Sequence, residues 1–358
     1  MQVICPTVND EIRKVKPLCP VFGECGGCQY QDIPYDEELR IKEDQVKTLF
    51  KDKMGLDAKF IERILPSPST YHYRNRLDLK LIRTTQYGIQ IGFSPEGRNR
   101  MVPVDQCPIA HRKISDFIPE LKKQVESRLP QRYRTANLVV RTGDDEKVKW
   151  GGIGRRSLQL KEADYFWTVL DGKRIFYSLD TFFQANLSIL PAVIGLIRSL
   201  SIWSSTLTLY DLYCGVGVFG ICLADLVKKV IMIEDNPSSV ALARHNTATH
   251  ALKTADIHPG KVEEVFPEIL NSPQTKEKSE SVALLDPPRA GLSPKVIEAL
   301  NQALQVRSIL YLSCHPESLV RDLKMISSNK WQVKKVFPLD FFPKTKHIEI
   351  LVWLEAMR

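Results

Sequence analysis

The feature that most constrains the fold is a regular alternation of strand-like and helix-like segments after Thr181. Apolar runs of strand length recur between amphipathic stretches, and the clearest are TLTLYDLY, KVIMIE, SVALLDPP and SILYLSC. Strands that alternate with helices of this length indicate βαβ units and a parallel sheet. Two later runs, VKKVFPLD and IEILVWLE, predict two closing strands. We therefore expect a doubly wound α/β domain over residues 176–358.

The chain before this domain divides into two parts. Residues 61–175 contain short strand-like runs separated by turn residues, with one helix expected at 111–129, and predict a smaller β-rich central domain. Residues 1–60 begin with a loop-like segment rich in Cys, Pro and Gly, followed by an amphipathic helix expected at 36–50. A chain of 358 residues with 43% hydrophobic side chains is long enough for two or three domains with their own cores.

Three cysteines near the N-terminus have the spacing of a metal site. Cys19, Cys25 and Cys28 lie in CPVFGECGGC, a C-x5-C-x2-C pattern whose glycines let the backbone wrap around a cation. Spacing alone leaves two candidates open, a zinc ion and a [4Fe–4S] cluster, because each takes four thiolates. We expect Cys107 to be the fourth ligand, since Pro and polar residues flank it in a loop, and Cys5 is the alternative.

The positive charge of the chain is concentrated in its central part. Between His72 and Lys161 there are 19 Lys and Arg against 9 Asp and Glu, a balance of +10 in a chain whose total is +8. Several arginines come as close pairs near aromatic residues: Arg74 and Arg76, Arg98 and Arg100, Arg132 and Arg134, and Arg155 and Arg156. This pattern is typical of a face that binds phosphates and stacks bases, although a solvated basic surface is the simpler interpretation.

A glycine turn after the first strand of the α/β domain predicts a cofactor crevice. DLYCGVGVFG follows TLTLY and opens a helix, and Gly215 and Gly217 allow a ligand to approach the backbone closely. Glu234 ends the next strand, where its carboxylate can accept hydrogen bonds from ribose hydroxyls. Because an acid, Asp211, opens the motif and no GxGxxG follows, we favour S-adenosylmethionine over the alternative, a dinucleotide.

Three polar residues are expected beside this crevice. Asp286 in LLDPPRAGL and Cys314 in SILYLSCHP each stand where a strand ends, and ligands in open α/β sheets bind beyond the carboxyl ends of strands. Cys314 is therefore a candidate nucleophile, although a strand cysteine is often a small buried hydrophobe. Glu349, two residues after His347, begins the last strand and is a candidate proton acceptor. A plain surface glutamate is the alternative.

The motifs occur in an order that resembles a known family. That family is the RNA uracil-C5 methyltransferases, and the resemblance is strongest to the iron–sulfur-containing 23S rRNA enzymes of bacteria. It covers the chain from about Cys19 to the C-terminus and rests on CPVFGECGGCQYQ, YRNR, FFQAN, DLYCGVGVF, DPPRAGL, YLSCHP and DFFPKTKHIE.

The resemblance implies a fold, two cofactors and a site. The fold is a C-terminal Rossmann-like class I S-adenosylmethionine methyltransferase domain with an N-terminal iron–sulfur segment and a β-rich central domain that contributes one ligand. Cys314 would be the nucleophile, Glu349 the base, and Arg289 and His315 would help to lower the pKa of the thiol. The implied ligands of a [4Fe–4S] cluster are Cys19, Cys25, Cys28 and Cys107, and the implied cofactor-pocket residues are Gln184, Tyr213, Glu234 and Asp286.

The implied reaction is methylation of uridine at C5. Because C5 is a weak nucleophile, thiolate addition at C6 is expected to form an enolate that concentrates charge at C5. The cysteines favour 23S rRNA as substrate, and the T-loop uridine of tRNA is the alternative. A non-catalytic iron–sulfur RNA-binding factor is the alternative from another class.

The sequence also departs from the family pattern. The ribosomal enzymes often begin with a small β-barrel RNA-binding domain, and we expect none here because 18 residues precede Cys19. Val218 replaces a polar cofactor contact, and His315 replaces the usual Asn after the nucleophile. The first 20 residues lack an apolar stretch, so we expect no secretory signal and a cytoplasmic protein. We also expect a monomer without a membrane partner.

Overall fold

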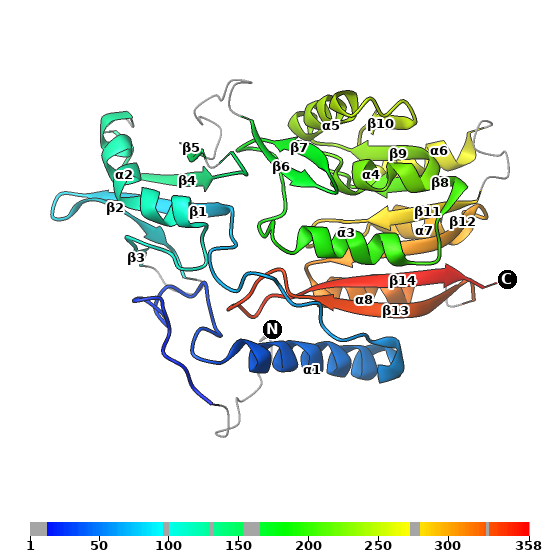
Figure 1. The fold of residues 1–358 in the computed structure, drawn as a ribbon, viewed down its shortest axis with the longest axis horizontal. Helices are drawn as coiled ribbons and strands as arrows, with labels where there is room; N and C mark the ends of the chain where they lie inside the picture. The colour runs from blue at the N-terminus through cyan, green and yellow to red at the C-terminus, as the bar shows by residue number, and fades with distance from the viewer. Residues whose placement is uncertain are drawn as a thin grey trace.

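Two β-sheets and the helices around them make up most of the chain (Figure 1). The structure is a computed structural model. It describes residues 13–95, 100–128, 130, 132–145, 147–152, 165–272, 280–326 and 329–357. Cys5, Arg98, Arg155 and Arg156 lie outside the described residues.

The predicted α/β domain contains a seven-stranded sheet in the described chain, with the strand order β10-β9-β8-β11-β12-β14-β13. Neighbouring strands from β10 to β12 run parallel, and β14 lies antiparallel between β12 and β13. The strands are β8 (Ser204–Leu212), β9 (Val227–Glu234), β10 (Ala255–Pro259), β11 (Ser281–Leu285), β12 (Val306–Ser313), β13 (Trp331–Leu339) and β14 (Glu349–Ala356).

Helices cover both faces of this sheet because its strands are apolar on both sides. Leu209 and Leu284 pack into one hydrophobic cluster, while the neighbouring Tyr210 and Leu285 pack into a second cluster on the opposite face. The first cluster is covered by α3 (Leu190–Ser199), α4 (Val218–Cys222) and α5 (Pro237–Thr249). The second is covered by α1 (Tyr35–Met54), α6 (Val262–Asn271), α7 (Pro294–Gln302) and α8 (Pro316–Met325).

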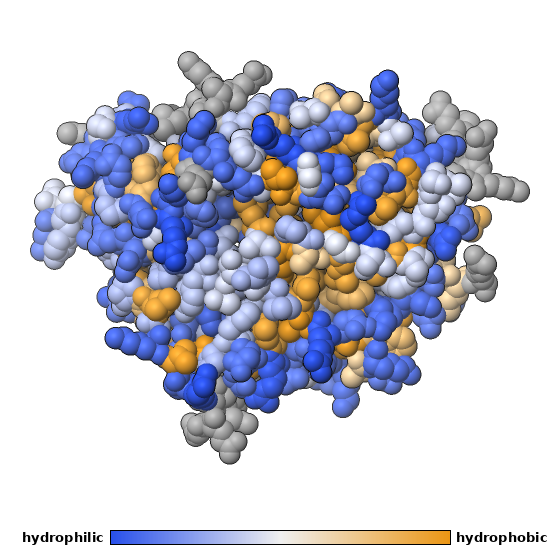
Figure 2. Space-filling view, viewed as in Figure 1, coloured by the Kyte–Doolittle hydropathy of each residue, from blue (hydrophilic) through white to orange (hydrophobic). Residues whose placement is uncertain are grey.

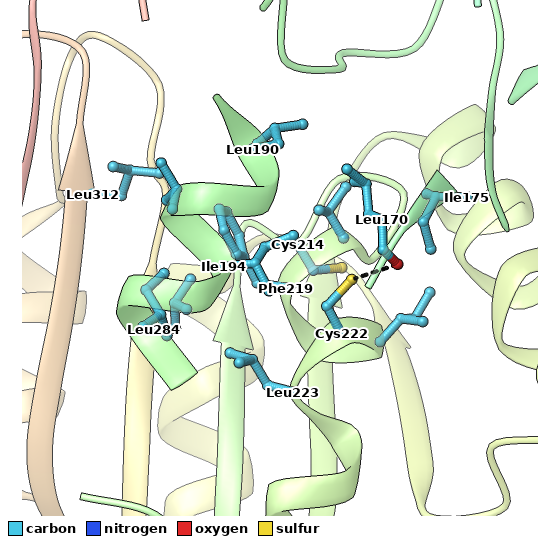
Figure 3. Packing of buried hydrophobic residues seen from close by; sticks show 14 of the residues in the cluster. Leu170, Ile175, Leu190, Ile194, Cys214, Phe219, Cys222, Leu223, Leu284 and Leu312 are labelled. Atoms are coloured by element: carbon cyan, nitrogen blue, oxygen red, sulfur yellow. Dashed lines mark hydrogen bonds between the residues drawn. The ribbon is translucent and has the colours of Figure 1, made fainter. Parts of the chain in front are cut away.

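The first cluster also contains Cys222, a cysteine that was not predicted to belong to any site. Figure 3 shows its thiol directed at the Leu170 carbonyl oxygen, at a distance of 3.8 Å. Cys222 is fully buried, so it behaves as a small hydrophobic residue of the core.

The central part of the chain forms a smaller antiparallel sheet in the order β3-β2-β1-β4-β5. Its strands are β1 (Arg76–Thr84), β2 (Gly88–Phe93), β3 (Val102–Pro103), β4 (Thr135–Arg141) and β5 (Lys149–Gly152). Helix α2 (Arg112–Arg128) packs on it through Ile114, Ile118 and Leu121. A separate hairpin, β6 (Phe166–Leu170) and β7 (Lys173–Tyr177), packs into the first cluster of the large sheet.

The N-terminal helix α1 is joined to the large sheet and lies near β13 (Figure 1). Val46 and Phe50 are buried in the second cluster, and Gly55 ends the helix in the left-handed conformation. The described residues also form two 3₁₀ turns, at Ala58–Phe60 and Ala224–Leu226. The helices predicted at 36–50 and 111–129 are confirmed as α1 and α2.

The surface is mostly hydrophilic on the face shown in Figure 2, and hydrophobic side chains gather across its middle, around α3. In the described part of the chain, every helix is too short or too polar to cross a lipid bilayer.

Candidate active site

The predicted site residues meet at one edge of the large sheet. The parallel strands β8, β11 and β12 end there, so Tyr213, Asp286 and Cys314 each follow a strand end directly. Because β14 runs antiparallel to β12, it begins at this edge, and its first residue is Glu349. The register fixes this arrangement, since Ser313 pairs with Ile350.

The Cys314 thiol is half-buried between charged groups. Burial raises its pKa above the usual value, and the nearby carboxyl groups of Glu349 and Asp286 raise it further. Arg289, which is hydrogen-bonded to the thiol, lowers this pKa, but its effect is smaller than that of burial and the two carboxyls. These surroundings therefore favour the neutral thiol.

His315 contributes to this site in a different way from the one predicted. Its ring Nδ1 accepts a hydrogen bond from the Ser318 backbone N–H at 3.2 Å and lies 2.9 Å from the Ser318 hydroxyl. The side chain thus caps α8 and is absent from the groups that shift the pKa of Cys314. Of the two helpers expected for the thiol, Arg289 alone acts on it in the described chain.

Glu349 is a carboxyl group without a fixed partner. Its side chain is buried, and its Oε2 atom has no hydrogen-bond partner among the described residues. Burial, together with the neighbouring Asp286 carboxyl, raises the pKa of Glu349 well above its usual range. A buried and unpaired carboxyl oxygen is costly for stability, which makes a functional role more plausible than a structural one.

Asp286 links the nucleophile to the predicted cofactor residues. Gln184 donates a hydrogen bond from its Nε2 to Asp286 Oδ2 at 3.3 Å. Although part of its surface is accessible, the surrounding protein raises the pKa of Asp286 to about 7, and the buried Asp211 adds to this effect. Asp286 therefore changes its charge near neutral pH and lies in the electrostatic field of both Cys314 and Glu349.

The glycine turn between β8 and α4 is built by two acids. Three of its residues have positive φ: Tyr213 (64°), Gly215 (57°) and Gly217 (88°). Glu234 accepts hydrogen bonds from the backbone N–H groups of Gly215 and Asn236, both at 2.9 Å. A carboxylate has further lone pairs, so Glu234 can still accept ribose hydroxyls while it holds the turn.

Asp211 is a site residue whose contacts the sequence did not predict. It accepts a hydrogen bond from the Gly220 N–H at 2.7 Å, and its other oxygen has no partner in the described chain. Burial raises its pKa to about 7. The signal was present in the acid that opens DLYCGVGVFG, but the motif does not say which backbone group the acid binds.

Arg141 was also missed, because nothing in its strand-like surroundings marks it as buried. It ends β4, is fully buried and donates hydrogen bonds to the carbonyl oxygens of Ser178, Thr181 (2.9 Å) and Phe183 (3.4 Å). Its guanidinium lies over the Tyr177 ring at 5.1 Å. Burial lowers its pKa to about 9. Arg141 thus holds the backbone that leads to Gln184.

The four predicted cysteine ligands line one cavity of about 600 Å³. Cys19, Cys25 and Cys28 come from the N-terminal turns, and Cys107 comes from the loop before α2. Burial raises the pKa of Cys28 to about 12, and the other three thiols raise it further, so the four lie close to one another. In the described chain, however, no group of three His, Cys, Asp or Glu side chains is arranged to hold a metal ion. His347, predicted near the reaction site, also lines this cavity.

Comparison with known proteins identifies the family. A profile of the tRNA (Uracil-5-)-methyltransferase family matches residues 153–357, more than half of the chain. The chain belongs to this family. An uncharacterized RNA methyltransferase of Caldanaerobacter subterraneus is 30% identical over 96% of this chain and 85% of its own length. The tRNA (uracil(54)-C(5))-methyltransferase of Pyrococcus abyssi is 27% identical over 97% of this chain and 88% of its own.

The fold of this methyltransferase is shared with a solved structure. The crystal structure of Pyrococcus abyssi tRNA (uracil-54, C5)-methyltransferase in complex with S-adenosyl-L-homocysteine matches with a TM-score of 0.72 and 24% identity. The match covers 92% of this chain and 85% of that chain. The Rossmann-like α/β fold class is therefore confirmed.

Family membership also confirms the predicted enzyme class, an S-adenosylmethionine-dependent RNA uracil-C5-methyltransferase. It goes against two alternatives that the sequence left open, a dinucleotide in the glycine turn and a non-catalytic RNA-binding factor.

Proposed function

We propose that the enzyme methylates uridine through a covalent adduct between Cys314 and C6 of the base, with Glu349 as the proton acceptor. The observation that carries this proposal is that the Cys314 thiol and the Glu349 carboxyl lie at the same edge of the sheet, where the parallel strands end. One oxygen of Glu349 has no hydrogen-bond partner among the described residues, and the nearby Asp286 carboxyl raises the pKa of both groups.

The proposed methylation of uridine has three steps: addition of the thiol, methyl transfer and proton abstraction. The Cys314 thiol loses its proton to solvent or a nearby base, the sulfur forms a bond to C6, and the C5=C6 pair moves into an enolate. S-adenosylmethionine, when bound, would supply the methyl group to C5 and leave as S-adenosylhomocysteine, with the electron pair of the methyl–sulfur bond kept on sulfur. Glu349 in its ionised form then accepts the C5 proton, the C5–H electrons restore the C5=C6 bond, and the Cys314 thiolate leaves C6. The net exchange replaces one proton on C5 with a methyl group.

We propose that Gln184, Tyr213, Glu234 and Asp286 hold the cofactor. The support is their position: the first and last are hydrogen-bonded at 3.3 Å, and Glu234 organises the glycine turn that Tyr213 opens. Asp286 is shared between cofactor and base, so it orients the methyl group toward C5.

A single substitution tests the proposed base. In Glu349→Gln, methyl transfer proceeds but the C5 proton cannot be removed, so a methylated protein–RNA adduct accumulates and can be detected on a denaturing gel. The matched control is Glu355→Gln, on the same strand, which should resemble the wild type. If Glu349→Gln forms no adduct while it still binds RNA, Glu349 is not the base.

For the substrate we propose a uridine in 23S rRNA, supported by the cysteine motif that resembles the ribosomal enzymes. The T-loop uridine of tRNA is a second candidate, supported by relatives in Schizosaccharomyces pombe and Pyrococcus abyssi that carry the name tRNA (uracil(54)-C(5))-methyltransferase. The central part, residues 61–175, would bind either RNA through its basic side chains. Methylation of separated, unmodified rRNA and tRNA decides between them, and product in tRNA alone overturns the first proposal.

We propose that Cys19, Cys25, Cys28 and Cys107 hold a [4Fe–4S] cluster. The support is a set of four thiols around a cavity of about 600 Å³. A cubane binds each thiolate to a different iron, so its ligands lie further apart than around one tetrahedral zinc ion. Protein purified without oxygen should contain about four iron and four sulfide per chain, and Cys107→Ser should lose them while Cys222→Ser retains them. Stoichiometric zinc with no sulfide would contradict the proposal.

A further inference from the structure

A buried ionic cluster lies next to the segment that delivers Glu349 to the site. This lead-in segment, residues 340–348, leaves the sheet after β13 and returns to it at β14. Leu339 and Glu349 form the last pair of the β13–β14 register, so the segment begins and ends at the same edge. The backbone of Glu349 is thus paired with the residue that directly precedes Asp340, the first residue of the segment.

The first anchor of the lead-in segment is Lys42 on α1. Its ammonium group has three N–H donors, and all three are used: on Glu38 Oε1 at 2.8 Å, Asp340 Oδ1 at 2.7 Å and the Phe342 carbonyl oxygen at 3.1 Å. Lys42, Glu38 and Asp340 are completely buried. The second oxygen of Asp340 accepts a hydrogen bond from the Tyr35 hydroxyl at 2.7 Å. The segment is thus fixed to α1 through saturated polar contacts.

The second anchor is Lys344, which has a left-handed backbone with φ of 67°. Its backbone N–H donates to Glu38 Oε1 at 2.7 Å, and its Nζ lies 3.2 Å from Glu38 Oε2. Its carbonyl oxygen accepts from the N–H groups of Gln29 and Tyr30, at 3.0 and 3.1 Å. The lead-in segment is therefore held both by α1 and by the cysteine segment, residues 19–30, which contains Cys19, Cys25 and Cys28 and ends with Gln29 and Tyr30.

Stability is a weak explanation for such a cluster. The two lysines and two acids sum to zero charge, but removing four charges from water costs free energy that their mutual attraction only partly returns. Apolar side chains of similar volume often give equal or greater stability at such positions. What a hydrogen-bonded ionic cluster does supply is one defined geometry, because each hydrogen bond restricts both distance and direction.

Glu349 needs that geometry more than other site residues do. Its Oε2 has no hydrogen-bond partner among the described residues, so no contact of the carboxyl oxygen itself aims it at the base. A proton acceptor has to lie within hydrogen-bond distance, about 2.6–3.2 Å, of the atom that gives up the proton. Its direction must then come from its backbone, which pairs with β13 next to Asp340 and directly follows the lead-in segment.

We propose that Lys42 and Asp340 are positioning residues for the proton-abstraction step. The inference rests on the proposed function, in which Glu349 removes the C5 proton after methyl transfer. Formation of the Cys314–C6 bond and methyl transfer to C5 precede that step and do not use the Glu349 carboxyl as acceptor. Loss of the cluster is therefore expected to delay the late step and to spare the early ones.

The test uses the double variant Lys42→Met/Asp340→Asn in the full-length enzyme. It removes one positive and one negative charge and leaves the Glu38–Lys344 pair, so no net charge is left buried. The matched control is Glu37→Gln/Arg40→Met, which removes an exposed pair from the same helix. Glu349→Gln is the reference for loss of the base.

Two rates are measured in single turnovers on RNA labelled with tritium at uridine C5. Methyl incorporation into RNA reports the early steps, and tritium release into water reports proton abstraction. In the double variant we expect tritium release to slow at least tenfold and the methylated adduct to accumulate, while methyl incorporation stays within threefold of the wild type. The control variant should match the wild type in both rates.

Each other outcome has a distinct meaning. If both rates fall together, or neither falls, while Glu349→Gln accumulates adduct, the positioning role is wrong and the proposed base stands. If Glu349→Gln itself forms no adduct, the proposed function fails at the base. Should the double variant not fold, Asp340→Asn alone, which keeps the Lys42–Glu38 pair, is measured in the same way, and wild-type rates in that folded variant overturn the inference.

Discussion

At the scale of single residues, the cysteines of this enzyme differ in what surrounds them. Cys314 lies among two carboxyls and an arginine, whereas Cys222 lies among leucines and isoleucines (Figure 3). Cys314→Ala should lower methyl transfer by at least ~10³-fold, because no other group can form the bond to C6. Cys222→Ala should retain activity and lose about 1–2 kcal/mol of stability through a small cavity. Activity comparable in the two variants would contradict the nucleophile.

The acidic residues of the site make stability depend on pH. Burial raises the pKa of both Asp211 and Asp286 from 3.8 to about 7, so the folded state holds protons that the unfolded state has lost in that range. The free energy of unfolding should therefore fall as pH rises from about 4 to about 7. Asp286→Asn should flatten this slope in denaturant titrations.

A carboxyl group whose pKa is lowered provides the control for that titration. A hydrogen bond from Arg198 lowers the pKa of Asp225, so its contribution is present above pH 3.8 and is lost as pH falls below that value. Asp225→Asn should leave the slope between pH 4 and 7 unchanged. An equal slope in wild type and Asp286→Asn would show that Asp286 is already charged at low pH.

At the scale of elements, the sequence predicted what depends on local pattern. Helices α1 and α2 and strands β8, β9, β11 and β12 follow from amphipathic periodicity and from buried apolar runs. Strand β10 was missed because Ala255–Pro259 is not an apolar run, and β3 because it has two residues. The placement of β14 between β12 and β13 depends on contacts distant in sequence, which no local pattern contains.

The same distinction applies to the site. Asp286, Cys314 and Glu349 were predictable because strand ends of an α/β sheet share an edge. Glu38 and Lys42 were not, since an acid and a lysine four residues apart are typical of an exposed helix face. Their burial arises only when Asp340 packs against α1. Tertiary packing, more than residue type, decides what such a pair does.

The glycine turn between β8 and α4 allows a prediction about the cofactor. Gly217 has φ of 88°, and a Cβ there would lie 3.1 Å from Ile221 and Met232 side-chain atoms. Gly217→Ala should cost about 1–2 kcal/mol in the turn and raise the KM for S-adenosylmethionine about tenfold. Gly195→Ala, on the exposed side of helix α3 with open space around it, should instead add up to about 1 kcal/mol of stability and leave KM unchanged. An unchanged KM in Gly217→Ala would contradict a role for this turn in binding.

At the scale of the whole molecule, three parts of the chain depend on one another through buried polar contacts. The cysteine segment and α1 hold the lead-in segment, and the central sheet reaches the catalytic domain through Arg141. These contacts join residues from 37 to more than 300 positions apart, so the geometry of each part depends on the others. The small sheet therefore also holds the backbone next to Gln184.

Arg141 tests this dependence directly. It forms no salt bridge within the described chain, and its guanidinium binds the carbonyl oxygens of Ser178, Thr181 and Phe183. Arg141→Met leaves these buried acceptors without donors, at a cost of about 3 kcal/mol or more in the free energy of unfolding. Since the same backbone leads to Gln184, the affinity for S-adenosylmethionine should fall with it, as calorimetry on the folded variant would show.

The matched control for Arg141 is Arg307→Met, which removes a partly exposed arginine paired with Glu280 on the large sheet. A surface pair of this kind contributes about 0–1 kcal/mol, so both stability and cofactor affinity should stay close to the wild type. If Arg141→Met destabilises the protein but binds S-adenosylmethionine normally, the arginine joins the sheets without shaping the pocket. If Arg141→Met changes neither stability nor cofactor affinity, other contacts hold the backbone of residues 178–183. One such contact is the stacking of the Tyr177 and Phe183 rings, whose centroids are 4.0 Å apart.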